Sequence, residues 1–278
     1  MRLPPKRKYS LVEAGLDKQH DPVAREILYE HPLNERIRTF LRLESLFTQA
    51  AHHVKRSSEW DSRATLNCIL EILSLFGNAN LKSEVLKELE RHAFGLKRLE
   101  HNPDIDDKQL VELLDVIGSH IDSLHRINGQ VGSELKSSEF LLSIRQRSGI
   151  PGGTCDFDLP AFHYWLQQPV KERSDDLYRW LNSFDAIGQA IQFILKITRE
   201  STTLTPTIAE HGVYQQTLDP NLPHQMVRIA LPADSPYFAE LSGGRHRFTA
   251  RFLNFSAVED RARQTNEDVG FGLACCAL

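Results

Sequence analysis

A change in hydrophobic periodicity near residue 200 strongly constrains the fold of this 278-residue chain. Before it, apolar residues recur every three or four positions, which predicts helices over 34–54, with Asn34 as the N-cap, and over 61–76, 85–96 and 106–127. A short helix is predicted from Pro160 to about 168, and a further helical run from beyond Pro169 to about 200. From Ser201 onward, Thr, Val, Phe and turn residues predict short strands at 207–218, 225–231, 245–255 and 268–276, with Gly243-Gly244 as one of the turns between them. The pattern predicts an α+β fold, with an N-terminal, mainly α-helical bundle domain followed by a mainly antiparallel β-strand domain.

The same pattern divides the chain into three parts. Residues 1–25 mix Pro, Lys, Arg, Asp and Gly without a period, which predicts a flexible N-terminal extension. The helical domain is expected over 26–200 and the β-strand domain over 201–278. Within the helical half, the alternation from Gly152 to Asp158 predicts one additional strand, near 152–158, that joins the sheet.

Composition and charge argue against several classes of protein. The formal net charge is −4, whereas a general nucleic-acid binder needs a broad positive field around its phosphate contacts. No run approaches the roughly 18 apolar residues of a membrane span, and no apolar segment follows the basic N-terminus, so no membrane association or export is expected. The four cysteines lack any framework spacing, which is typical of a reduced, cytoplasmic protein.

Motifs that would bring a cofactor or a catalytic centre are missing from the sequence. It contains neither GxxxxGK[ST] nor HExxH, and the adjacent Cys275 and Cys276 are expected to pack as small apolar side chains. No cofactor and no metal are therefore predicted. Asp156 and Asp158 would share one face of the predicted strand, which is the best acid-base geometry available. A solvated face or a pairing with arginine explains them better, so a hydrolase is a minor alternative.

The segment GGRHRFTARF at 243–252 carries an unusual row of arginines. In a strand, Arg245, Arg247 and Arg251 face one side, while Phe248 and Phe252 face the other. Further basic clusters occur at Arg36, Arg38 and Arg42, and at Arg145 and Arg147. If the fold gathers them, they form a site for an acidic peptide or a phosphate backbone. An RNA-binding protein that uses the basic strand face is the alternative hypothesis, although the phenylalanines face away from the arginines.

Four segments of the sequence resemble the ZapD family of bacterial cell-division proteins. They are LYEHPLNERIRTFLRLE at 28–44, EVLKELERH at 84–92, RQRSGIPGGTCDFDLPAFHYWL at 145–166 and SGGRHRFTARF at 242–252. The resemblance implies a helical domain, a β-strand domain, a homodimer and no enzymatic activity. It also implies binding to the C-terminal tail of FtsZ, bundling of FtsZ protofilaments and support of the Z-ring at midcell, in the cytoplasm.

The resemblance further implies a basic groove between the two domains that binds this tail. Its basic positions match Arg42, His163 and Arg247. Other basic residues near these motifs are expected to contribute: Arg38, Arg245, Arg251, Arg145 and Lys82. Two further basic positions of the groove are occupied here by Asn78 and Glu139, with Lys82 and Lys136 nearby.

Charge alone does not account for tight binding to such a groove. An exposed ion pair contributes about 0.2–1 kcal/mol, whereas micromolar affinity needs about 8 kcal/mol. An apolar part of the tail must therefore be buried as well. Phe40, Phe162 and Trp165 are the aromatic residues nearest to the basic motifs in the sequence, and they are the predicted anchors.

Overall fold

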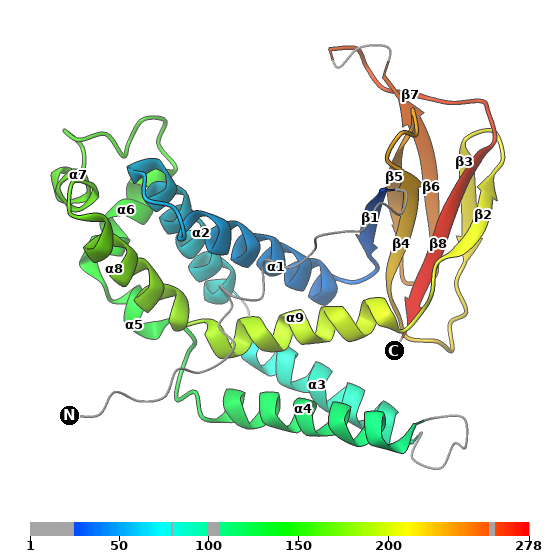
Figure 1. Ribbon diagram of the computed structural model, residues 1–278, viewed down its shortest axis with the longest axis horizontal. Helices are drawn as coiled ribbons and strands as arrows, with labels where there is room; N and C mark the ends of the chain where they lie inside the picture. The colour runs from blue at the N-terminus through cyan, green and yellow to red at the C-terminus, as the bar shows by residue number, and fades with distance from the viewer. Residues whose placement is uncertain (1–24, 79, 99–105, 256–258, 278) are drawn as a thin grey trace. The chain divides into compact units, whose positions relative to one another are not determined.

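The computed structural model describes residues 25–78, 80–98, 106–255 and 259–277, and it confirms the α+β class (Figure 1). Helices come first and antiparallel strands follow. The described residues form two compact units. We call residues 42–192 the helical unit, and residues 25–41 together with 193–277 the strand unit. The expected flexible extension at 1–25 lies outside the described residues, apart from Arg25.

The long predicted helices form where the apolar period placed them, and the N-cap residue expected for the first, Asn34, accepts a hydrogen bond from the backbone N–H of Ile37 at 2.9 Å. The short helix predicted from Pro160 forms, and the predicted run beyond Pro169 is divided into two helices, while two helices between 133 and 148 were not predicted. The helices are α1 (Glu35–His53), α2 (Glu59–Asn78), α3 (Leu81–Lys97), α4 (Asp107–His125), α5 (Ser133–Lys136), α6 (Glu139–Ser148), α7 (Pro160–Leu166), α8 (Val170–Asn182) and α9 (Asp185–Glu200).

The strands form two antiparallel sheets within the strand unit. Sheet A has the order β1-β4-β8-β2, and sheet B has the order β3-β6-β5, with β7 paired to the end of β6. The strands are β1 (Glu26–Pro32), β2 (Thr205–Ala209), β3 (Val213–Thr217), β4 (His224–Pro232), β5 (Phe238–Gly244), β6 (Arg247–Asn254), β7 (Arg263–Gln264) and β8 (Val269–Ala277).

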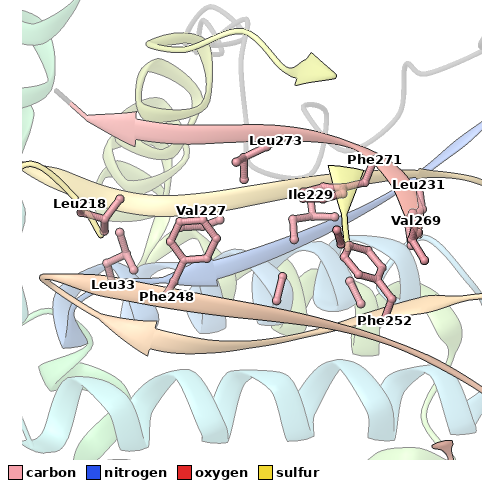
Figure 2. Close-up of a cluster of buried hydrophobic side chains, with 13 residues drawn as sticks. Leu33, Leu218, Val227, Ile229, Leu231, Phe248, Phe252, Val269, Phe271 and Leu273 are labelled. Carbon is pink, nitrogen blue, oxygen red and sulfur yellow. The ribbon is translucent and has the colours of Figure 1, made fainter. Parts of the chain in front are cut away.

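A hydrophobic core lies between the two sheets, as Figure 2 shows. Phe248 and Phe252 of β6 are fully buried, and Phe252 packs on Phe271 of β8 with ring centroids 4.9 Å apart. Val227 and Ile229 of β4 reach the same core from sheet A. Because alternate residues of β6 point into this core, the intervening residues of β6 point away from it.

Three expectations about the strands are wrong, and three of the described strands were not predicted. Residues 152–158 form turns instead of a strand: Gly152 has a positive φ, and a Cβ on the buried Gly153 would lie 2.6 Å from the backbone oxygen of Arg147. Segment 207–218 is two strands in different sheets, separated by the positive-φ residues His211 and Gly212. β1, β5 and β7 were not predicted, and β1 puts residues 26–32 in sheet A instead of a helical domain.

An ionic cluster joins β1, β4 and the last turn of α9 within the strand unit. Both oxygens of Glu30 accept hydrogen bonds from Arg199, at 2.8 and 2.7 Å, and Arg228 donates to the same carboxylate at 3.2 Å. All three side chains are largely buried, so each charge is paired where solvent is scarce. The cluster lies on the face of sheet A opposite the sandwich core, and it links β1 to β4 and to α9.

Candidate functional site

The predicted arginine row lies on the β5–β6 hairpin of sheet B. Arg247 and Arg251 belong to β6 and are exposed on the face opposite the core, as the alternation predicted. Arg245 and His246 form the two-residue turn of the hairpin, so placing Arg245 on the strand is wrong. The pair Gly243-Gly244, predicted as the turn, instead ends β5. Arg245 is exposed at the tip, beside Arg247.

Close packing explains the glycine before this turn. A Cβ on Gly243 would lie 2.6 Å from the Cα of Phe248, its partner across the hairpin, so a larger residue would force the strands apart. The carbonyl oxygen of Gly243 is also 3.4 Å from Nε2 of His31 at the end of β1. Burial lowers the pKa of His31, which favours the neutral ring beside the basic tip.

The outer face of sheet B continues beyond the arginines with side chains that were not predicted to matter. Glu240 pairs in register with Arg251, and Phe238 pairs with Leu253. The ring of Phe238 stacks on Phe255 at a centroid distance of 4.9 Å. The alternation Phe238, Glu240, Ser242 in the sequence was the available signal. It was missed because Gly243-Gly244 was interpreted as a turn.

The arginines of α1 have different surroundings. Nε of Arg38 is 3.1 Å from Glu35, one turn earlier, so part of its charge is already paired. Arg42 is exposed and lines a surface pocket of about 420 Å³ between α1 and α2. The apolar side chains of Leu46 and Leu75 line the same pocket, as does the carboxylate residue Glu71. The cation of Arg42 therefore lies beside an apolar surface of the helical unit.

The basic residues of α6 and α7 are exposed, although one of them is already paired. Arg145 lies in the last turn of α6, and His163 is an exposed residue of α7. Arg147 donates a hydrogen bond to Asp158 at 3.2 Å, whereas Asp156 is exposed. The strand that would have aligned the two carboxylates does not form, so the predicted arrangement on which the hydrolase alternative depended is wrong.

Lys82 has a structural contact in addition to its charge. Its Nζ donates to the backbone oxygen of Ile127 at 2.7 Å, just after α4 ends, where the helix dipole favours a cation. Lys136 donates to the backbone oxygen of Phe76 at 3.5 Å. Glu139 is exposed at the start of α6, and Asn78 is the last residue of α2. Both lysines therefore donate to backbone oxygens of the helical unit. Lys82 also lines a pocket of about 520 Å³.

The predicted aromatic anchors are wrong. Phe40 is fully buried, and Phe162 and Trp165 are exposed by only 3% and 9%. Phe162 and Trp165 pack with Phe140 and Trp180 in a ring cluster of the helical unit, because they lie on the apolar faces of their helices. The phenylalanines of β6 on which the RNA alternative relied, Phe248 and Phe252, are likewise buried in the sandwich core, so their rings cannot stack on bases.

Other chemistry finds little support in the described part of the chain. Within it, no group of three or more His, Cys, Asp or Glu side chains gathers as metal ligands would. All four cysteines are free, and burial raises the pKa of Cys68 and Cys276 to about 11, so neither is an activated nucleophile. None of the helices in the described ranges is long and apolar enough to cross a membrane.

A helical unit and a β-sandwich unit, each bearing exposed arginines, define an α+β protein whose prominent surface features suit binding. The comparisons with known proteins make the assignment specific. The family model "ZapD: Cell division protein" matches residues 41–251. The cell division protein ZapD of Methylococcus capsulatus is 41% identical over 253 residues, covering 91% of this chain and 99% of that protein. Those of Coxiella burnetii and Nitrosomonas eutropha are 34% and 36% identical, each covering 91–92% of this chain and all of the relative. The chain belongs to the ZapD family of cell division proteins.

Proposed function

We propose that this protein binds FtsZ through the C-terminal tail of FtsZ and cross-links FtsZ protofilaments into bundles. It acts as a homodimer in the cytoplasm, at the division site, where it promotes assembly of the Z-ring. The role requires binding alone and no catalysis. Membership of a family of cell division proteins supports the cellular role.

One structural observation carries the binding mode. Arg247 and Arg251 lie exposed on the same face of one strand, with Arg245 at the adjacent tip. Side chains that are held by a sheet lose less freedom on binding than those of a loop, and arginine forms bidentate contacts with carboxylates. An acidic peptide is the ligand that this arrangement fits best. Arg42 and His163 are exposed in the helical unit and stay predicted binding residues.

Sedimentation of polymerised FtsZ tests the proposal. The wild-type protein should pellet with FtsZ polymers and increase their light scattering, and it should do neither with FtsZ that lacks the C-terminal tail. Arg247→Glu should weaken co-sedimentation about tenfold or more, since it replaces an attraction by a repulsion. Arg179→Glu, an equal charge change on α8 at a side chain that is 69% exposed, is the matched control. Undiminished bundling of tail-less FtsZ would refute the binding mode.

Two further measurements address the assembly and the location. One chain has a mass of 31.7 kDa, and sedimentation velocity should give twice this mass for the homodimer. A fluorescent fusion expressed in dividing cells should form a band at midcell, and the band should disappear when FtsZ is depleted. Increasing salt should weaken binding to FtsZ, because exposed charges are screened over about 8–10 Å at ordinary ionic strength.

A further inference from the structure

The outer face of sheet B has a basic end and an apolar end. Residues 247, 249, 251 and 253 of β6 alternate with the buried residues 248, 250 and 252, so they all face outward. On β5, Phe238 and Glu240 share this face, because they pair in register with Leu253 and Arg251. Arg247 lies at the hairpin tip and Arg251 near the middle of β6, whereas Phe238 lies at the end toward β7.

The apolar end is built around two stacked rings. Phe238 and Phe255 are nearly parallel, with an interplanar angle of 20° and centroids 4.9 Å apart. Phe255 keeps 49% of its surface exposed, and Leu253 is only half-buried beside it. The sandwich core on the other face is complete without them, since Phe248 and Phe252 are fully buried there. A contiguous apolar surface outside the core, next to charges, is typical of an interaction site.

We propose that Phe238, Leu253 and Phe255 are the apolar anchor of the peptide site, and that they bind a large apolar side chain of an acidic peptide whose carboxylates reach Arg247 and Arg251. We call these three residues the anchor surface. The inference rests on the proposed function, because the acidic peptide is the FtsZ tail. It replaces the buried aromatic residues predicted from the sequence with rings that a ligand can contact.

Charge complementarity selects an acidic peptide as the occupant. Among the outward-facing described positions of β5 and β6, Glu240 is the one anion, and Arg247, Arg251 and the tip residue Arg245 outnumber it. Glu240 pairs with Arg251, so Arg247 is the arginine farther from an anion on this face. From residue 247 to residue 253, the strand rises about 20 Å, a length that six or seven extended peptide residues span. One short segment can therefore contact both ends of the face.

Fluorescence anisotropy with two labelled peptides tests the anchor surface. The first is the C-terminal tail of FtsZ, and the second is the same tail with its large apolar residues replaced by serine and its charges unchanged. Phe255→Ser should raise the Kd for the first peptide tenfold or more, which corresponds to about 1.4 kcal/mol. It should leave the weaker Kd for the second peptide within about twofold, because that peptide has no side chain to anchor.

Two more variants sharpen the test. Ile208→Ser removes a side chain that is 64% exposed on β2, in the other sheet, and it should bind both peptides like the wild type. Glu240→Gln should lower the Kd for both peptides, because it removes the anion beside Arg251. Circular dichroism of each variant checks that the sandwich is folded, which is expected because the mutated side chains lie outside the core.

The outcomes separate this inference from the proposed function. If the wild type binds the tail but Phe255→Ser binds it equally well, the anchor surface is refuted and the proposed function stands. Equal losses on both peptides would also refute it, since the ring would then not contact the apolar side chain. If the wild type binds neither peptide, both the inference and the proposed function fail.

Discussion

Arg173 offers the sharpest test of how the helical unit is held together. This residue of α8 is a charged side chain with only 6% of its surface exposed. Its guanidinium donates to the backbone oxygens of Gln168, Ser58 and Ser57, at 3.1, 3.4 and 3.1 Å, and to the hydroxyl of Ser62 at 2.7 Å. It thereby joins the turn before α8 to the turn between α1 and α2. Replacing Arg173 with Met keeps an unbranched apolar stem but removes the guanidinium and with it every donor.

The magnitude follows from these four contacts. The bond to Ser62 is buried, and losing a charged donor there costs about 1.5–3 kcal/mol. The other three are only partly buried, so water replaces part of each, and together they add about 1–2 kcal/mol. We expect the free energy of unfolding to fall by about 3 kcal/mol. For a unit of this size, the melting temperature would then fall by about 6–12 °C.

Tryptophan fluorescence during urea denaturation measures this loss in the right unit. All three tryptophans lie in the helical unit, at Trp60, Trp165 and Trp180. Arg179→Met is the matched control on the same helix, because Arg179 is 69% exposed and should contribute less than about 1 kcal/mol. Arg173→Lys should fall between the two, since one ammonium cannot reach all four acceptors. If Arg173→Met unfolds within 1 kcal/mol of the wild type, the buried contacts do not stabilise the unit.

Two other groups give measurable signatures. In the native protein, Ellman's reagent should modify the exposed Cys155 first. Cys68 and Cys276 should react only after unfolding, because burial raises the pKa of both thiols to about 11. Four fast thiols per chain would contradict this prediction. The hydroxyl of Ser58 and the ring of His53 hold the pKa of Asp61 below its usual value. The ionised carboxylate of Asp61 therefore stabilises the fold above about pH 4. This stabilisation is lost as the pH falls through the lowered pKa of Asp61. Asp61→Asn should therefore flatten the decline of unfolding free energy below about pH 4 in urea titrations, and an unchanged acidic limb would contradict the assignment.

Local sequence patterns correctly predicted the elements that form because of residues within the element itself. The helix from Glu35 to His53 was predicted with its N-cap because both the apolar stripe and Asn34 are local signals. The inward and outward faces of β6 were also correct, because Phe248, Ala250 and Phe252 alternate with polar residues next to one core. Such patterns need no knowledge of distant parts of the chain.

Elements that depend on distant partners were missed. β1 pairs with β4 through contacts such as Glu30 to Arg228, almost 200 residues apart, and its own burial does not alternate cleanly. The aromatic anchors failed for a related reason. Phe162 and Trp165 lie near basic residues in the sequence, but the helical packing buries them, whereas Phe238 and Phe255 meet only because β5 and β6 form a hairpin. Proximity in the sequence is a poor guide to which side chains a ligand can reach.

On the proposed function, a weak single site is sufficient. Exposed arginines contribute at most a few kcal/mol, and burying one large apolar side chain against the anchor surface contributes about 1.5–3 kcal/mol more. The lost freedom of the two partners offsets much of this gain, so one site alone holds one tail only weakly. In a dimer, the second contact to a polymer is intramolecular, with an effective tail concentration in the millimolar range. Such a dimer would bind filaments, which present many tails, far more tightly than free FtsZ subunits, although every tail is the same.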